Sequence, residues 1–124
     1  GEFNSPTFVF GGEMGVVLQN RGSDGLPGSS STPQDVFLIK LRDDGFPEWG
    51  LSVGGSRGEV GSGVAVDETG SIYLTGSFDS LQCSFGNDYV LGLTTRDVQD
   101  LFLAKVSVFG SVLWAVGGGG GGYD

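Results

Sequence analysis

The sequence contains no histidine, one cysteine and only four prolines among its 124 residues. Without histidine the chain lacks the commonest general base and zinc ligand, and no Ser-His or Cys-His nucleophile can form. The single Cys83 excludes an intrachain disulfide and a multi-cysteine metal site, so we expect a small buried apolar side chain there. These absences argue against most hydrolytic, redox and zinc-dependent functions.

Basic residues and long apolar runs are also scarce. The chain has six Lys and Arg residues and 15 Asp and Glu residues, which gives a net charge of −9. Such a surface repels nucleic-acid phosphates and anionic lipids. No apolar run approaches the length of a membrane span, and the start of the chain shows no signal peptide. We therefore expect no nucleic-acid partner and no membrane insertion.

Glycine is abundant, with 25 residues. The sequence also repeats itself internally, as two alignments of the chain with itself show. A first alignment, which places Asp35 on Asp100, matches DVFLIKLRDDGFPEW (35–49) to DLFLAKVSVFGSVLW (100–114) without gaps. A second alignment, which places Gly1 on Gly76, matches the first residues of the chain to GSFDS (76–80). The second spacing is longer, and the extra residues fall in GSDGLPGSSSTPQ (22–34), whose Gly, Ser and Pro content predicts an expanded surface loop.

The repeat unit predicts β-structure in every part. VFLIKL (36–41) and LFLAKV (101–106) are apolar, rich in branched or aromatic residues and bounded by turn residues, which predicts strands buried on both faces. Asp-Gly between two apolar stretches predicts a hairpin, and GVAVD (63–67) with SIYLTG (71–76) predicts another. TFVF near the N-terminus predicts a further short strand. No segment shows helical periodicity, so we expect an all-β fold.

The order of these residues resembles the seven-bladed β-propeller repeat family (SBBP-type repeat). The pattern is Asp-x-Phe-Leu-x-Lys at 35–40, Gly45, Trp49, Gly-Gly at 54–55, and Val-Ala-Val-Asp-x-x-Gly-x-Ile-Tyr-x-Thr-Gly at 64–76. The resemblance implies antiparallel four-stranded blades in tandem and an extracellular or cell-surface location. About one and a half to two units are present. VSVFG, which lacks the aspartates of LRDDG, departs from the pattern.

We divide the chain by these units. Residues 1–34 are expected to hold the tail of a preceding unit and the Gly/Ser/Pro loop, 35–97 a complete unit, and 98–124 a truncated second unit that ends in a glycine-rich segment. Large and branched residues that recur in register are expected to pack the core of the repeat. These residues are Phe37, Trp49, Val64, Val66, Tyr73, Phe102 and Trp114.

The two units are incomplete when the ends of the chain are compared. Asp124 aligns with Glu59 and Gly1 with Gly76, so residues 60–75 have no counterpart. One and a half blades cannot close a propeller, and an open stack exposes strand edges that favour self-association. Either the chain is a window of a longer tandem array, or a neighbouring copy supplies the missing strands. The expected interface residues are Phe8, Phe10, Val116 and Tyr123.

Acidic pairs are the remaining candidates for chemistry. The pairs Asp43-Asp44, Asp67-Glu68 and Asp97/Asp100 could serve as calcium ligands or as a glycosidase carboxylate pair. Calcium at Asp43, Asp44 and Asp67 is a weak possibility. No spaced Asp-x-Asp-x-Asp-Gly loop is present, so aspartates that cap their own turns are the simpler interpretation and no cofactor is expected. Lysines at strand ends are expected to keep their heads in solvent.

These observations favour a non-enzymatic structural or assembly function, as an extracellular or cell-surface propeller or filament component that self-associates by completing strands. The partners would be copies of the chain or further repeats of a longer polypeptide. The alternative is a glycan- or protein-binding β-propeller module that uses Tyr73, Tyr89 or Tyr123. A carboxylate-based hydrolase is least favoured. In a secreted protein, residues 29–32 could carry O-linked sugar.

Overall fold

The structure, a computed structural model, describes residues 1–22, 33–92 and 99–120. This part of the chain is almost entirely antiparallel β-structure, which confirms the predicted all-β fold, with one short 3-10 helix, η1 (Gly12–Met14). The strands are β1 (Glu2–Phe3), β2 (Thr7–Phe10), β3 (Val16–Gln19), β4 (Asp35–Leu41), β5 (Pro47–Gly54), β6 (Glu59–Val66), β7 (Ile72–Phe78), β8 (Gln82–Phe85), β9 (Tyr89–Gly92), β10 (Asp100–Val106) and β11 (Val112–Gly118).

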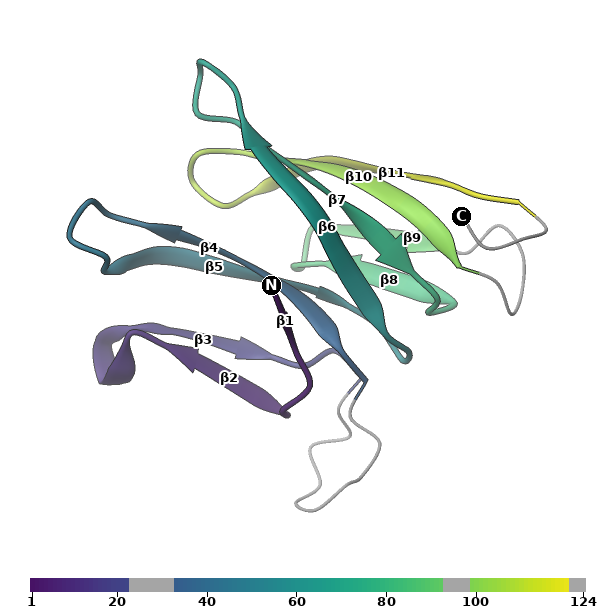
Figure 1. Cartoon of the computed structure of the whole chain (residues 1–124), viewed down its shortest axis with the longest axis horizontal. Coiled ribbons are helices and arrows are strands. Elements are labelled where there is room, and N and C mark those ends of the chain that lie inside the picture. The colour runs from purple at the N-terminus through teal and green to yellow at the C-terminus, as the bar shows by residue number, and fades with distance from the viewer. Residues whose placement is uncertain (23–32, 93–98, 121–124) are drawn as a thin grey trace.

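The strands form three layers (Figure 1). The middle layer is a five-stranded sheet in the order β1-β4-β5-β8-β9, and the upper layer is a four-stranded sheet in the order β6-β7-β10-β11. The lower layer is the two-stranded hairpin β2–β3. The chain therefore alternates between layers. Hairpin β2–β3 lies between β1 and β4 in the sequence but outside their sheet, and hairpin β8–β9 lies between β7 and β10 but joins the middle layer.

The predicted hairpins are present, and their turns contain glycines that adopt left-handed backbone angles. Gly45 lies between β4 and β5, and Gly70 lies between β6 and β7, with φ angles of +84° and +83°. A side chain is strained at such angles, which explains glycine there. Hairpins β4–β5 and β10–β11 share a register shift at the same position of the repeat. The shift lies between Lys40 and Leu41 in the first hairpin and between Lys105 and Val106 in the second. The sequence repeat is thus a structural repeat.

The core lies between the middle and upper layers. Alternate residues of each strand face it, as expected for a pleated strand with one buried side. One cluster of buried side chains joins the two sheets. Its members are Val36, Leu51, Val53, Cys83 and Phe85 from the middle layer and Ile72, Leu74, Phe78, Phe102, Ala104, Val106, Val112 and Ala115 from the upper layer. Cys83 is fully buried, as expected.

The expected packing residues occupy different environments. Phe102 is buried in the core and Trp49 packs against it. Phe37 is half-buried on the other face of β4, where its ring stacks on Phe8 at 4.8 Å between centroids. Tyr73 and Trp114 are half-buried neighbours, with ring centroids 6.3 Å apart.

Val64 and Val66 are not part of this core, contrary to expectation, because they are 61% and 65% exposed. They lie on the same face of the upper layer as their cross-strand partners Leu74 and Ile72, which are buried. The difference arises at the edge of the molecule. The middle layer ends there in β1, which has only two residues, so no strand covers this part of β6.

Each repeat also buries an aspartate against a glycine. Asp35, the first residue of β4, and Asp100, the first residue of β10, are fully buried. A Cβ atom at Gly54 would overlap the carboxyl group of Asp35, and one at Gly119 would overlap that of Asp100. Glycine is therefore required at this position of the repeat because the carboxyl group fills the space of a side chain.

We predict that Gly54→Ala destabilises the fold by about 1–3 kcal/mol, because the added methyl group forces Asp35 or the strand to move. Gly58→Ala is the matched control, since nothing lies within 4 Å of a Cβ atom there. Urea unfolding followed by circular dichroism measures both variants. Equal unfolding midpoints for the two variants would contradict the overlap.

Candidate functional site

The outer face of the upper layer is apolar and open. Leu101 and Leu103 of β10 are 49% and 39% exposed, and Val116, opposite Leu103 on β11, is 53% exposed. Trp114 lies opposite Lys105 on the same face. We call these five residues the open face. The prediction that both faces of 101–106 are buried is therefore wrong in this structure, because no described layer covers the outer side of β10.

The sequence repeat shows what this kind of face does elsewhere in the molecule. The alignment of Asp35 with Asp100 maps the open face onto Val36, Leu38, Lys40, Trp49 and Leu51 of the middle layer. There Val36 and Leu51 are buried against the upper layer, and Leu38 and Trp49 pack on the same cluster. The open face thus has the composition of a surface that is covered by another sheet in the preceding repeat.

Polar contacts reinforce the covered version of this face. The indole nitrogen of Trp49 donates to the carbonyl oxygen of Val108 at 2.9 Å, and Nζ of Lys40 donates to the same oxygen at 3.4 Å. Lys40 also forms an ion pair with Glu48 at 3.0 Å. Its head is therefore not simply solvated, as the sequence predicted, because the β10–β11 turn reaches over it. In the open face, Lys105 instead lies 5.5 Å from the ring centre of Tyr73.

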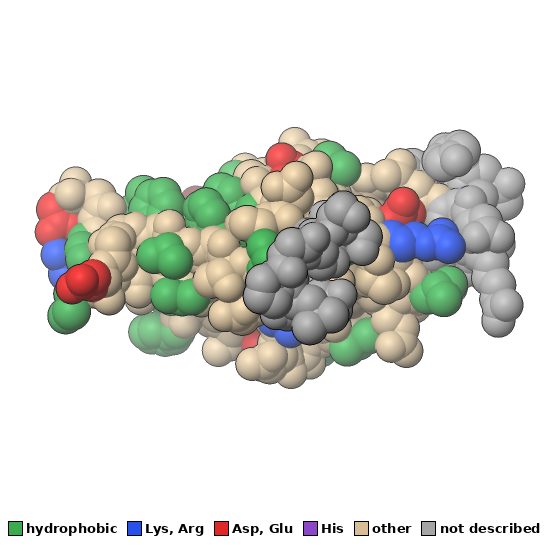
Figure 2. Space-filling view, turned by 90° about the horizontal axis from the view of Figure 1, so that it is seen from below, with side chains coloured by type: hydrophobic (Ala, Val, Ile, Leu, Met, Phe, Trp, Pro, Cys, Tyr) green, Lys and Arg blue, Asp and Glu red, His purple; other side chains and the backbone are tan. Residues whose placement is uncertain are grey.

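The predicted interface residues lie on opposite sides of the molecule. Val116 belongs to the open face, whereas Phe8 and Phe10 belong to the lower layer. Tyr123 lies outside the described residues. Figure 2 views the molecule from below and shows hydrophobic side chains over the hairpin β2–β3, where Val9 and Val17 are exposed. Apolar surface is thus present on both outer sides of the layered structure.

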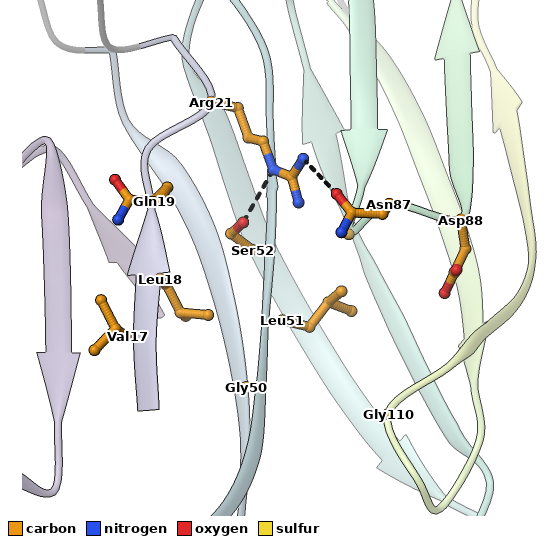
Figure 3. A pocket seen from close by; sticks show the side chains of 11 residues that line it. Val17, Leu18, Gln19, Arg21, Gly50, Leu51, Ser52, Asn87, Asp88 and Gly110 are labelled. Carbon is orange, nitrogen blue, oxygen red and sulfur yellow. Dashed lines mark hydrogen bonds between the residues drawn. The ribbon is translucent and has the colours of Figure 1, made fainter. Parts of the chain in front are cut away.

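A cavity of about 530 Å³ lies where the lower and middle layers meet the β10–β11 turn (Figure 3). Arg21 is its central polar side chain: Nε donates to Ser52 Oγ at 3.0 Å and a terminal nitrogen donates to Asn87 Oδ1 at 3.5 Å. Asp88 accepts a hydrogen bond from the backbone nitrogen of Val112 at 2.9 Å. These bonds connect hairpin β2–β3, strand β5 and the β8–β9 turn, so the polar side chains position the layers.

The turn aspartates act on their own loops. Oδ1 of Asp67 accepts hydrogen bonds from the backbone nitrogens of Thr69 and Ser71, and the side-chain hydrogen bond from Thr69 is the main reason why the pKa of Asp67 is lowered. Asp44 forms an ion pair with Arg42 at 2.5 Å. Asp43, the third residue considered for calcium, is exposed. Within the described ranges, no three acidic, His or Cys side chains are grouped to hold a metal ion.

Two carboxyl groups are buried at the junction of the layers, and the sequence analysis did not predict their burial. Glu59 is fully buried at the start of β6, where it accepts hydrogen bonds from the Ser80 hydroxyl group and, at 3.1 Å, from the backbone nitrogen of Gly55. Asp35 accepts a bond of 2.5 Å from the backbone nitrogen of Arg21. Burial raises the pKa of Glu59 to about 8 and that of Asp35 to about 6. The recurrence of Asp35 at Asp100 was the available signal.

The remaining expected site residues do not gather into one site. Tyr73 is half-buried and its hydroxyl group donates to Asp67 at 3.1 Å, whereas Tyr89 lies at the start of β9, in another layer. Asp97 and residues 29–32 lie outside the described residues. Among the residues described, no helix has the length and apolar character needed to span a membrane.

Comparison with curated proteins matches 120 residues, 94% of the chain, to an uncharacterized WD repeat-containing protein of Acanthamoeba polyphaga mimivirus at 26% identity. The chain spans only 8% of the length of that protein. No family model and no solved structure matches the sequence. WD repeats build the four-stranded blades of β-propellers, so the likeness and the layered sheets support a β-propeller-type repeat. The seven-bladed repeat family suggested by the sequence is not identified by this match.

We predict that the protein loses stability as the pH rises from about 4.5 to about 8. The pKa of Glu59 rises from 4.5 to about 8 on folding and that of Asp35 from 3.8 to about 6, so the folded protein binds the extra protons. The contribution of each group is fully present below its ordinary pKa and is lost as the pH passes its raised value, at up to about 1.4 kcal/mol per pH unit.

Urea midpoints measured between pH 5 and pH 8.5 test this assignment. In Glu59→Gln only Asp35 of the two groups still titrates, so the urea midpoint of this variant should stop falling above about pH 6. The midpoint of the wild type should continue to fall toward about pH 8. Glu13→Gln, at an exposed position, is the control and should follow the wild type. Parallel curves for Glu59→Gln and the wild type would exclude Glu59 as the titrating group.

Proposed function

We propose that the chain is a non-enzymatic β-propeller-type structural segment that assembles by stacking its open face on a further unit of the same repeat. One observation carries this proposal. Leu101, Leu103 and Val116 of the open face are exposed, whereas in the middle layer the counterparts of Leu101 and Val116 are buried and the counterpart of Leu103 packs on the core cluster. Because the two faces share the same residue types in the same register, the same kind of partner fits both.

The partner's surface is also represented in this chain. The middle layer packs onto the side of the upper layer that carries Phe102, Ala104 and Val106. The repeat counterparts of these residues are Phe37, Ile39 and Leu41, on the far side of the middle layer. Hairpin β2–β3 covers part of that side, and Leu41 is exposed. One copy therefore presents both halves of the contact, which favours head-to-tail association.

The WD repeat-containing relative supports an interaction function in general, since β-propellers present surfaces rather than one fixed chemistry. Of the two alternatives, glycan binding and protein binding, the exposed apolar side chains of the open face favour protein binding. We propose a second unit of the repeat as the partner. An extracellular or cell-surface location and membership of the seven-bladed repeat family rest on the sequence resemblance and belong to the proposal.

We predict that the chain self-associates and that Leu101→Gln combined with Leu103→Gln weakens association at least about tenfold. Each leucine side chain that is covered on association contributes about 1.5–3 kcal/mol when fully buried, and the variant removes that gain. Sedimentation velocity over a concentration series measures the change. Phe109→Gln is the control, because Phe109 is 84% exposed but lies in the β10–β11 turn, outside the open face.

Two results would contradict the proposal. A wild-type chain that stays monomeric at millimolar concentration would exclude stacking between copies. Equal loss of association in Phe109→Gln and in the double variant would show that apolar exposure in general, and not the open face, drives association.

A further inference from the structure

The outer edge of β5 is paired with a hairpin that comes later in the sequence. Strand β8 pairs with it in antiparallel register, with Val53 opposite Phe85 and Gly54 opposite Ser84. The backbone nitrogen of Gly86 adds a hydrogen bond of 3.0 Å to the carbonyl oxygen of Ser52. Val53 and Phe85 are both fully buried. Hairpin β8–β9 therefore follows two strands of the upper layer in sequence but extends the sheet of β4 and β5.

Hairpin β2–β3 is the counterpart of this hairpin. The alignment of Gly1 with Gly76 maps β2 onto β8 from end to end, with Phe10 on Phe85. The residue that follows each strand is a glycine with left-handed backbone angles, Gly11 and Gly86. The packing agrees as well, since β3 packs against β5 as β9 packs against β11. Within the described residues, however, β2 pairs only with β3, so its outer edge has no strand beside it.

Strand β11 is the counterpart of β5. The alignment of Asp35 with Asp100 maps Ser52 and Val53 onto Gly117 and Gly118. In the part of the chain that is described, β11 pairs only with β10, so its outer edge is open too. Nothing lies within 4 Å of a Cβ atom placed at Gly118, at the position where Val53 is enclosed in the first repeat.

We propose that the outer edge of β11 binds strand β2 of a second copy of this chain. The pairing repeats that of β5 with β8, so Phe10 of the second copy lies opposite Gly118 and its Gly11 nitrogen donates to the Gly117 carbonyl oxygen. This edge contact rests on the proposed assembly and adds a strand register to it. The upper layer is then extended to β6-β7-β10-β11 followed by β2–β3 of the next copy, and each copy offers the same two edges to further copies.

The register can be tested by disulfide trapping between two single variants, Phe10→Cys and Gly118→Cys. The bond from Gly86 to Ser52 makes these two residues the hydrogen-bonded pair, so the adjacent pair Val53 and Phe85 is the closely spaced one. Its counterpart, Gly118 and Phe10, therefore has the Cβ spacing that a disulfide requires. Cys83 stays in place because it is fully buried.

Mixing the two variants under mild oxidation should give a covalent dimer at about twice 12.8 kDa on a non-reducing gel. We expect at least about tenfold less of this dimer when Val17→Cys replaces Phe10→Cys, because exposed Val17 lies on β3, one strand further from β11. Association in sedimentation without preferential trapping of Phe10 with Gly118 would overturn the edge pairing and leave open-face stacking intact. Absence of any association would overturn the proposed function itself.

Gly117→Pro keeps the test decisive if Phe10→Cys does not fold. By the register above, the nitrogen of Gly117 faces the open edge, so proline removes a donor to the second copy and not to β10. Ordinary van der Waals space surrounds a Cβ atom at Gly117. The variant should keep the circular dichroism spectrum of the wild type and associate at least about tenfold more weakly. Unchanged association would overturn the pairing.

Discussion

Apolar side chains of the middle layer pack against those of the upper layer, and this contact positions every other feature of the structure. Val36 and Val53 meet Phe78, Phe85 and Phe102 in a region that excludes water. Burial of apolar surface is the main favourable term in folding, and neither sheet could bury its alternate residues alone. The hairpin β8–β9 extends the middle layer, so it completes the same contact at the far edge.

Polar groups at the ends of the strands hold the layers in register around that contact. Trp49 binds the β10–β11 turn, Arg21 ties hairpin β2–β3 to β5, and Glu59 joins the start of β6 to the loop at Gly55 and to Ser80. A buried polar group is costly unless it is hydrogen-bonded. The raised pKa of Glu59 reflects that cost, because the proton removes the buried charge.

The repeat places one set of residue types in two environments. In the first repeat, Val36, Leu38, Trp49 and Leu51 are covered by a sheet and the edge of β5 is paired. In the second repeat, the matching face and the matching edge of β11 are open among the described residues. A repeat architecture buries its surfaces by adding neighbours, so the open surfaces define both where a further unit binds and what that unit must look like.

The sequence by itself determined the long strands and their antiparallel hairpins. Alternation and Asp-Gly turns act over a few residues, and the left-handed glycine at Gly45 follows from the turn alone. Only the tertiary structure decided which faces are covered. Val64 and Leu101 look like core residues in the sequence, yet both are exposed, because burial depends on the layer above them. The tertiary structure likewise buried Glu59 and drew Lys40 toward Val108, since both contacts join residues that are distant in the chain or lie in different layers.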